Sequence, residues 1–237
     1  MPLPFEQYCS GDYLAHNPTW DADDSPWKVA QLLQLLRPHG IAPNDIVDVG
    51  CGAGRVLTAL RASFPAATLV GYEVATDAAR FWSRNQDPGI RFVVGDFLQS
   101  EFHRFDLLLL LDVIEHLPNP FEFLLKIRGR AKQYIFHFPL DLSSLTVLRE
   151  RPLLESRRQV GHIHYFTKGL ALSLLDECGF QVIDWRYTGA WRTGPQHTLK
   201  TRMAAIPRAL ASVVSKDLST RLFGGETLMV LARADER

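Results

Sequence analysis

The stretch Val47–Arg55 of this chain reads VDVGCGAGR, and it decides the fold. Its apolar start predicts a buried strand that ends at Val49, followed by a turn into a helix. Three glycines stand at alternate positions in this turn: Gly50, Gly52 and Gly54. Glycine permits backbone angles that other residues avoid, and it lets a ligand approach the main chain closely. Because the free N–H groups at a helix start can bind an anion, the stretch predicts a ligand-binding loop.

Strands and helices are predicted to alternate through the first two-thirds of the chain. The expected strands are Ile46–Val49, Ala67–Tyr72, Arg91–Val94, Asp106–Leu111 and Gln133–Phe138. The expected helices are Arg55–Ser63, Thr76–Asn85 and Phe121–Arg128. The continuous apolar run Leu107–Leu111 is typical of a strand buried on both faces of a parallel sheet. This alternation predicts an α/β fold with a Rossmann-like, doubly wound sheet.

The segments around this core are predicted to be mainly helical. Ser25 and Pro26 are typical of a helix start, which suggests an N-terminal helical cap over residues 1–40 ahead of a main domain over 41–237. Residues 139–160 look irregular or partly helical. Thr167 should cap a helix that runs to about Cys178, and strands are expected at Phe180–Tyr187 and Glu226–Ala232. Between those strands, residues 195–222 are predicted to form a helical insertion that is broken at Pro207.

Composition narrows the classes of function. The 237 residues carry 26 Lys/Arg and 26 Asp/Glu, and the only arginine cluster (149, 151, 157, 158) is interrupted by Glu150 and Glu155, so we do not expect a DNA-binding protein. The three cysteines are far apart, which argues against a disulfide framework and a cysteine zinc site. The longest apolar run is too short to span a bilayer, and the first residues show no signal-peptide pattern. We therefore expect a cytoplasmic protein without stable membrane insertion, as a monomer or a homodimer.

Several motifs in order carry a family resemblance. VDVGCGAGR resembles the first motif of class I S-adenosylmethionine-dependent methyltransferases. GYEVA, with Glu73, then follows the second strand, GDF (95–97) follows the third, and FDLLLLLDVIEHLPNP (105–120) resembles the family's fourth strand and its loop. HYFTKGLALSLLDECGFQVID (164–184) resembles a late helix and strand of the small-molecule branch, and GGETLMVLAR resembles the antiparallel seventh strand. The resemblance covers roughly residues 45–233 and implies a seven-stranded, mostly parallel sheet.

The resemblance implies that S-adenosyl-L-methionine is the cofactor and assigns roles to acidic residues. Glu73, about 20 residues after the glycine loop, would accept hydrogen bonds from the ribose hydroxyls. Asp96 would receive the adenine amino group, and Phe97 would lie beside the ring. The methionine end carries an ammonium and a sulfonium, for which Asp48 and Asp112 are the candidates. The implied cofactor site also contains the glycines Gly50, Gly52 and Gly54.

Histidines are the candidates for the transfer step. If the acceptor atom is a hydroxyl oxygen, a base has to remove its proton. His116 follows the fourth predicted strand, and His162 and His164 share one side of the chain if GHIHYFT is extended. These three are the predicted catalytic residues, whereas His137 lies in an apolar strand and is expected to be a hydrogen-bonded core residue.

A metal site is the competing interpretation of the same loop. DVIEH (112–116) resembles the EVIEH segment of quinone O-methyltransferases and small-RNA 2′-O-methyltransferases, in which carboxylates and histidine bind a divalent metal. His162 is the nearest match to a further histidine ligand of the small-RNA enzymes. Because Asp112 replaces the first glutamate, and metal-free relatives carry similar strings, no metal is included in the predicted site.

The expected activity is methyl transfer to a small-molecule acceptor, with oxygen favoured as the acceptor atom. RNA is the second choice of acceptor. Two further classes of protein stay open, a module that binds S-adenosylmethionine without catalysis and a nicotinamide-dependent oxidoreductase. The oxidoreductase is disfavoured, because neither register of the glycine loop places the third glycine of a GxGxxG fingerprint.

Overall fold

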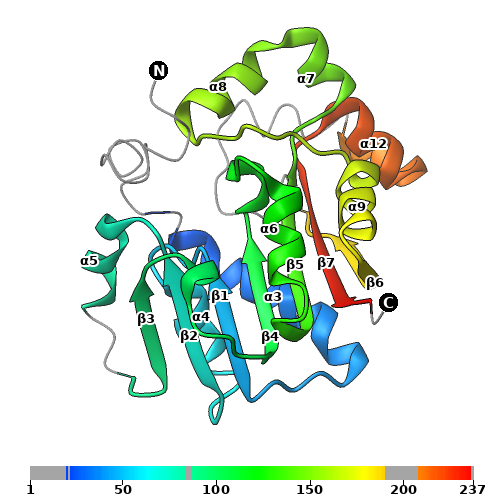
Figure 1. Ribbon diagram of the computed structural model, residues 1–237. Coiled ribbons are helices and arrows are strands. Elements are labelled where there is room, and N and C mark those ends of the chain that lie inside the picture. The colour runs from blue at the N-terminus through cyan, green and yellow to red at the C-terminus, as the bar shows by residue number, and fades with distance from the viewer. Residues whose placement is uncertain (1–19, 21, 84–86, 190–207, 236–237) are drawn as a thin grey trace.

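A single seven-stranded sheet organises the protein, as Figure 1 shows. The computed structural model describes residues 20, 22–83, 87–189 and 208–235. The strand order is β3-β2-β1-β4-β5-β7-β6. The first five strands are parallel, and β7 runs antiparallel to both β5 and β6. The strands are β1 (Asp45–Val49), β2 (Thr68–Glu73), β3 (Ile90–Val94), β4 (Phe105–Leu111), β5 (Ala131–Leu140), β6 (Phe180–Tyr187) and β7 (Glu226–Ala234). The predicted Rossmann-like fold with an antiparallel last strand is therefore confirmed.

Helices cover both faces of the sheet and bury its apolar side chains. The helices are α3 (Ser25–Leu36), α4 (Arg55–Leu60), α5 (Ala79–Trp82), α6 (Pro120–Ile127), α7 (Ser144–Arg149), α8 (Arg151–Gln159), α9 (Lys168–Glu177) and α12 (Lys216–Phe223). Short 3-10 turns occupy Ala22–Asp24, Arg37–His39, Thr76–Ala78, Phe97–Gln99 and Ile114–His116. One core cluster joins α6 and α9 to the sheet, and a second joins α3 and α4 to its opposite face. The run Leu107–Leu111 contributes to both clusters, as expected for a strand buried on two sides.

The structure refines several predicted boundaries. α4 ends at Leu60 instead of Ser63, and the helix expected over Thr76–Asn85 is a 3-10 turn followed by the short α5, with residues 84–86 outside the described ranges. Residues 139–160 contain the end of β5 and the helices α7 and α8, the first of which begins with a capping box at Ser143. Of the expected insertion at 195–222, residues 208–214 are helical and α12 follows, while 195–207 lie outside the described residues.

α3, the described helix of the expected N-terminal cap, packs on the sheet. The helix contacts α4, β7 and β6, and its Leu32, Leu35 and Leu36 are buried in the second core cluster. Their spacing follows one helix face, so the apolar periodicity of α3 and its burial agree. The remainder of the proposed cap, residues 1–19 and 21, lies outside the described residues.

The turn after β1 requires glycine at Gly54. Its φ is +72°, in the left-handed region, and a Cβ added there would lie 2.4 Å from Cε1 of Phe92. The Phe92 ring stacks on Trp82, and the Trp82 indole N–H donates to the carbonyl of Gly52 at 2.9 Å. The ring therefore cannot move away without disturbing the loop itself.

We expect Gly54→Ala to lower the free energy of unfolding by about 2–4 kcal/mol, because backbone strain and overpacking add. Gly40→Ala is the matched control: Gly40 also has a left-handed φ of +63°, but nothing lies within 4 Å of an added Cβ. That variant should lose only about 1–2 kcal/mol. Urea unfolding of both variants measures the difference, and equal losses would contradict the packing argument.

Candidate functional site

Glu73, the last residue of β2, holds the glycine loop. Its Oε2 accepts the Gly52 N–H at 3.0 Å, and its Oε1 accepts the Ala75 N–H at 3.0 Å. The carboxylate is buried, and burial raises its pKa, while these backbone N–H groups act in the opposite direction. Because both oxygens retain further lone pairs, Glu73 can accept hydrogen bonds from a ligand as well.

Asp48, in β1, is a second buried acid next to this loop. Burial raises the pKa of Asp48 to about 7. The Lys28 ammonium lowers that pKa and the Glu73 carboxylate raises it, and these two effects are smaller. An approaching cation would therefore favour the ionised form of Asp48.

Asp96 and Phe97 lie at the end of β3, where they form a local turn. Oδ1 of Asp96 accepts the Leu98 N–H at 2.9 Å and so caps the 3-10 turn Phe97–Gln99. The Phe97 side chain is buried in the core between Tyr72 and Phe105, and the Arg130 guanidinium lies 4.4 Å from its ring centroid. The Phe97 ring is thus a core side chain, whereas Asp96 is exposed.

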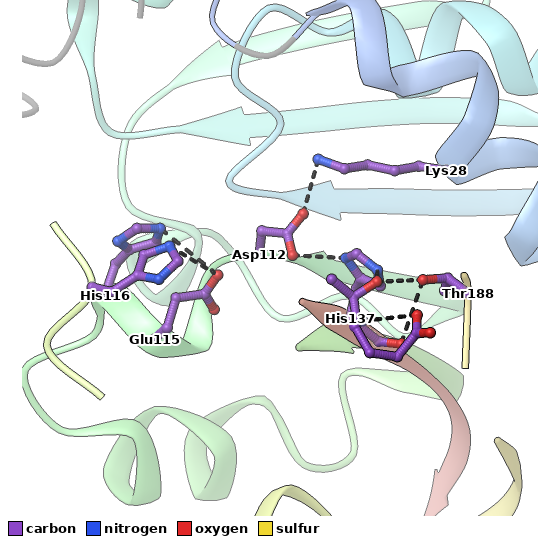
Figure 2. A network of polar contacts seen from close by, with 9 residues as sticks. Lys28, Asp112, Glu115, His116, His137 and Thr188 are labelled. Carbon is purple, nitrogen blue, oxygen red and sulfur yellow. Dashed lines mark hydrogen bonds and ion pairs between the residues drawn. The ribbon is translucent and has the colours of Figure 1, made fainter. Parts of the chain in front are cut away.

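Asp112 directly follows β4 and lies between two basic side chains, as Figure 2 shows. The Lys28 Nζ from α3 lies 2.8 Å from Oδ2, and His137 Nδ1 from β5 donates to Oδ1 at 2.7 Å. Burial disfavours the charged form, but His137 and Lys28 outweigh it and hold the pKa of Asp112 well below its usual range. The residue has a φ of +55°, which few side chains other than Asp and Asn adopt readily.

The same chain of contacts continues into β7. Nε2 of His137 lies 2.9 Å from the Thr227 hydroxyl, which in turn contacts the hydroxyl of Thr188. The His137 side chain is fully buried, in agreement with the prediction of a hydrogen-bonded core residue. Sequence reasoning missed Lys28, whose only signal is a basic residue on a helix that is otherwise apolar toward the sheet.

A separate cluster follows on the 3-10 turn Ile114–His116. Glu115 is fully buried, and neither of its carboxylate oxygens has a hydrogen-bond partner among the residues that the structure describes. His116 Nε2 and His162 Nε2 lie 3.8 and 3.9 Å from Oε1 of Glu115. Burial raises the pKa of Glu115 well above its usual range, and the nearby Asp112 raises it further.

The two histidines of the cluster are oriented by their other ring nitrogens. His116 Nδ1 lies 3.2 Å from the carbonyl of Gly161, and His162 Nδ1 lies 2.7 Å from Oδ2 of Asp141. Because Nδ1 donates in each case, Nε2 is the ring nitrogen that each histidine directs toward Glu115. Burial lowers the pKa of His116 to about 4, so it is the neutral imidazole at pH 7.

This geometry fits a divalent metal ion better than the sequence alone suggests. One ligand atom from each of Glu115, His116 and His162 lies within 4.8 Å of the other two. The buried carboxylate without a partner and the two oriented imidazoles match the oxygen and nitrogen ligands that magnesium, manganese or zinc accept. Asp112 is engaged by Lys28 and His137, so His162 takes the place in this set that the DVIEH motif suggests for Asp112.

His164 braces this loop. Its Nε2 donates to the carbonyl of Leu117 at 2.9 Å, while the N–H groups of Ile163 and His164 donate to the carbonyl of Glu115 at 2.9 and 3.1 Å. The segment after α8 is therefore tied to the end of β4. Of the three predicted catalytic histidines, the structure brings His116 and His162 together and places the His164 ring against the backbone.

Comparisons with known proteins place the chain in a family. The profile of a family described as "Methyltransferase domain" matches residues 24–184. Trans-aconitate 2-methyltransferase of Deinococcus radiodurans is 32% identical over 99 residues, which are 42% of this chain and 36% of that protein. Ubiquinone biosynthesis O-methyltransferase of Glaesserella parasuis serovar 5 is 27% identical over 132 residues, covering 48% of this chain and 55% of that protein.

The fold of a solved structure is also similar. The plantazolicin methyltransferase BpumL, crystallised with a monoazolic desmethylPZN analogue and SAH, has a TM-score of 0.65 at 14% identity, over 99% of this chain and 94% of that one. The chain spans only about a third to a half of the length of the two curated relatives. Across the described ranges, no helix is both long enough and apolar enough to cross a membrane. The family match, the glycine loop with Glu73 and the shared fold together show that the chain belongs to the methyltransferase-domain family, among the class I S-adenosylmethionine-dependent methyltransferases.

Proposed function

We propose that this protein transfers the methyl group of S-adenosylmethionine to an oxygen atom of a small-molecule acceptor. The observation that carries the proposal is the juxtaposition of two sites at the carboxyl ends of neighbouring strands. The acid-lined glycine loop follows β1, and the cluster of Glu115, His116 and His162 follows β4. In open α/β sheets ligands bind at this edge. The similarity to an O-methyltransferase supports oxygen as the acceptor atom.

The cofactor site is assigned to residues that keep bonding capacity. Glu73 binds the ribose hydroxyls, and the backbone of Gly50, Gly52 and Gly54 lets the cofactor approach closely. We assign the methionine ammonium to Asp48, because both oxygens of Asp112 are already engaged by Lys28 and His137. The main role of Asp112 is then to orient the loop after β4, not to contact the cofactor. When bound, S-adenosylmethionine supplies an activated methyl group for in-line displacement.

The acceptor site is assigned to Glu115, His116 and His162, which would hold a divalent metal ion. A bound metal lowers the pKa of a hydroxyl, so the acceptor oxygen loses its proton more easily. Asp141 and the Gly161 carbonyl accept hydrogen bonds from Nδ1 of the two imidazoles, which directs each Nε2 toward Glu115. His164 fixes the loop that carries His162. The chain otherwise contributes alignment, which is worth on the order of 7–11 kcal/mol in favourable cases.

We expect Glu73→Gln to weaken the binding of S-adenosylhomocysteine by about 1–3 kcal/mol, roughly 5- to 150-fold, because charge-assisted hydrogen bonds to the ribose are lost. Glu101→Gln, an exposed acid before β4, is the matched control and should bind like the unmodified protein. Isothermal calorimetry gives both affinities, and thermal unfolding without ligand shows whether the glycine loop has been disturbed. Equal affinity of Glu73→Gln and the unmodified protein would place the ribose elsewhere.

The affinity for S-adenosylhomocysteine should fall as the pH drops below about 7. Asp48 has a pKa of about 7 in the free protein, and a bound ammonium requires its carboxylate form, so binding at lower pH releases a proton. The dissociation constant should rise up to about tenfold for each pH unit below 7 and level off above it. Calorimetry from pH 5.5 to 8.5 measures this slope. In Asp48→Asn the slope should disappear, and a slope that persists there would assign the titration to another group.

We expect a chelator to abolish the release of S-adenosylhomocysteine with hydroxyl-bearing acceptors, and a divalent ion to restore it. His162→Ala should weaken Mn²⁺ or Zn²⁺ binding by at least about tenfold, because it removes one of three ligands. His103→Ala, which changes an exposed histidine at the opposite edge of the sheet, is the control. Calorimetric ion titration of the unmodified protein and both variants separates binding from turnover. Unchanged activity with a chelator and no ion binding would return His116 and His162 to the role of metal-free bases.

A further inference from the structure

The three most exposed large apolar side chains of the described protein lie on two helical segments. Val213, Leu148 and Val214 are 86%, 84% and 82% exposed, and Leu210 and Val147 on the same two segments are 68% and 55% exposed. They belong to α7 and to the helical residues 208–214, which pack on α12 through hydrogen bonds between serines, and α12 in turn contacts α7. Figure 1 shows α7, α8 and α12 together at the end of the molecule beyond the carboxyl ends of the strands.

The helices of this region also expose positive charge. Six basic residues on α7, α8 and α12 are exposed: Arg149, Arg151, Arg157, Arg158, Lys216 and Arg221. The same described helices and their connection carry three acids: Glu150 is exposed, whereas Glu155 and Asp217 are partly exposed and pair with Arg151 and Lys168, so basic residues are in excess. The helical surface, which we define by Val147, Leu148, Leu210, Val213 and Val214 with these basic residues, is therefore both apolar and cationic.

We propose that this helical surface binds the interface of a bilayer that contains anionic lipids. Helices that lie in a membrane interface combine exposed aliphatic side chains, which enter the acyl boundary, with Lys and Arg, which contact the headgroups. A second copy of the chain fits the surface poorly, because this surface carries few acids that could pair with the arginines of the other copy. Nucleic acid explains the arginines but leaves the aliphatic side chains without a partner.

The position of the surface gives the contact a consequence for the site. α8 leads directly into Gly161 and His162, and Asp141, which orients His162, directly precedes the loop into α7. We call Glu115, His116 and His162 the acceptor cluster. A bilayer bound to the helical surface therefore lies next to the segment that carries His162 of this cluster. This inference extends the proposed function, yet the binding itself requires no activity and is tested without cofactor.

Sedimentation of the full chain with vesicles tests the proposal. The protein should bind vesicles of phosphatidylglycerol mixed with phosphatidylcholine and bind vesicles of phosphatidylcholine alone much more weakly, with binding reduced by salt. Leu148→Ser combined with Val213→Ser should reduce binding at least about tenfold, because two aliphatic side chains leave the acyl boundary. Arg149→Gln and Arg158→Gln should each reduce it about fivefold.

Phe102→Ser is the matched control, because Phe102 is 76% exposed but precedes β4 at the opposite edge of the sheet. It should bind vesicles like the unmodified protein, and thermal unfolding should confirm that all variants are folded. The proposal is overturned if no vesicle is bound, or if Phe102→Ser loses as much binding as the Leu148/Val213 variant. It is equally overturned if the chain forms a dimer that the Leu148/Val213 variant dissociates while vesicles are not bound. Tighter binding of single-stranded RNA that depends on the arginines alone would also overturn it.

Discussion

Buried carboxylates at one edge of the sheet are the constraint on which the site depends. The buried Asp48, Glu73 and Glu115 and the partly buried Asp112 all lie at or just beyond the carboxyl ends of β1, β2 and β4. A buried charge is strongly unfavourable unless it is paired or hydrogen-bonded. The protein satisfies Glu73 with backbone N–H groups and Asp112 with Lys28 and His137. For Asp48 and Glu115, the effect of burial on the pKa is larger than the effects of neighbouring groups, and the pKa is raised. These two acids are where a cationic ligand gains most by binding.

Local sequence patterns were sufficient to predict the sheet and the loop around which it is built. The run Leu107–Leu111 and the three glycines after Val49 depend on burial and backbone angle, which residue type reports directly. Boundaries were less predictable. The helix expected to reach Ser63 stops at Leu60, because Arg61 turns its guanidinium to the carbonyls of Phe64, Pro65 and Ala67 and closes the chain there.

The pairing of acids with their partners was not predictable from the sequence, because it depends on contacts between distant segments. DVIEH places Asp112, Glu115 and His116 within five residues, which suggests one site. The 3-10 turn Ile114–His116 separates them: Asp112 joins Lys28 from α3 and His137 from β5, while Glu115 joins His162 from beyond α8. Phe97 shows the same limit, since an aromatic residue after a strand is compatible with a ligand contact and with the core, and only packing distinguishes them.

The segment between β5 and α9 connects the acceptor cluster to the helical surface. It begins with Asp141, passes through α7 and α8, and returns through Gly161 and His162 to the loop after β4. Both of its ends contribute hydrogen bonds to the acceptor cluster, whereas its middle exposes Leu148 and four arginines to solvent. Its ends are held by the Ser143 capping box and by the bonds from Ile163 and His164 to Glu115, so the exposed middle is carried on a fixed base. Only Val160 and Gly161 separate the end of α8 from His162, so the helices that expose Leu148 and the arginines are joined directly to the acceptor cluster.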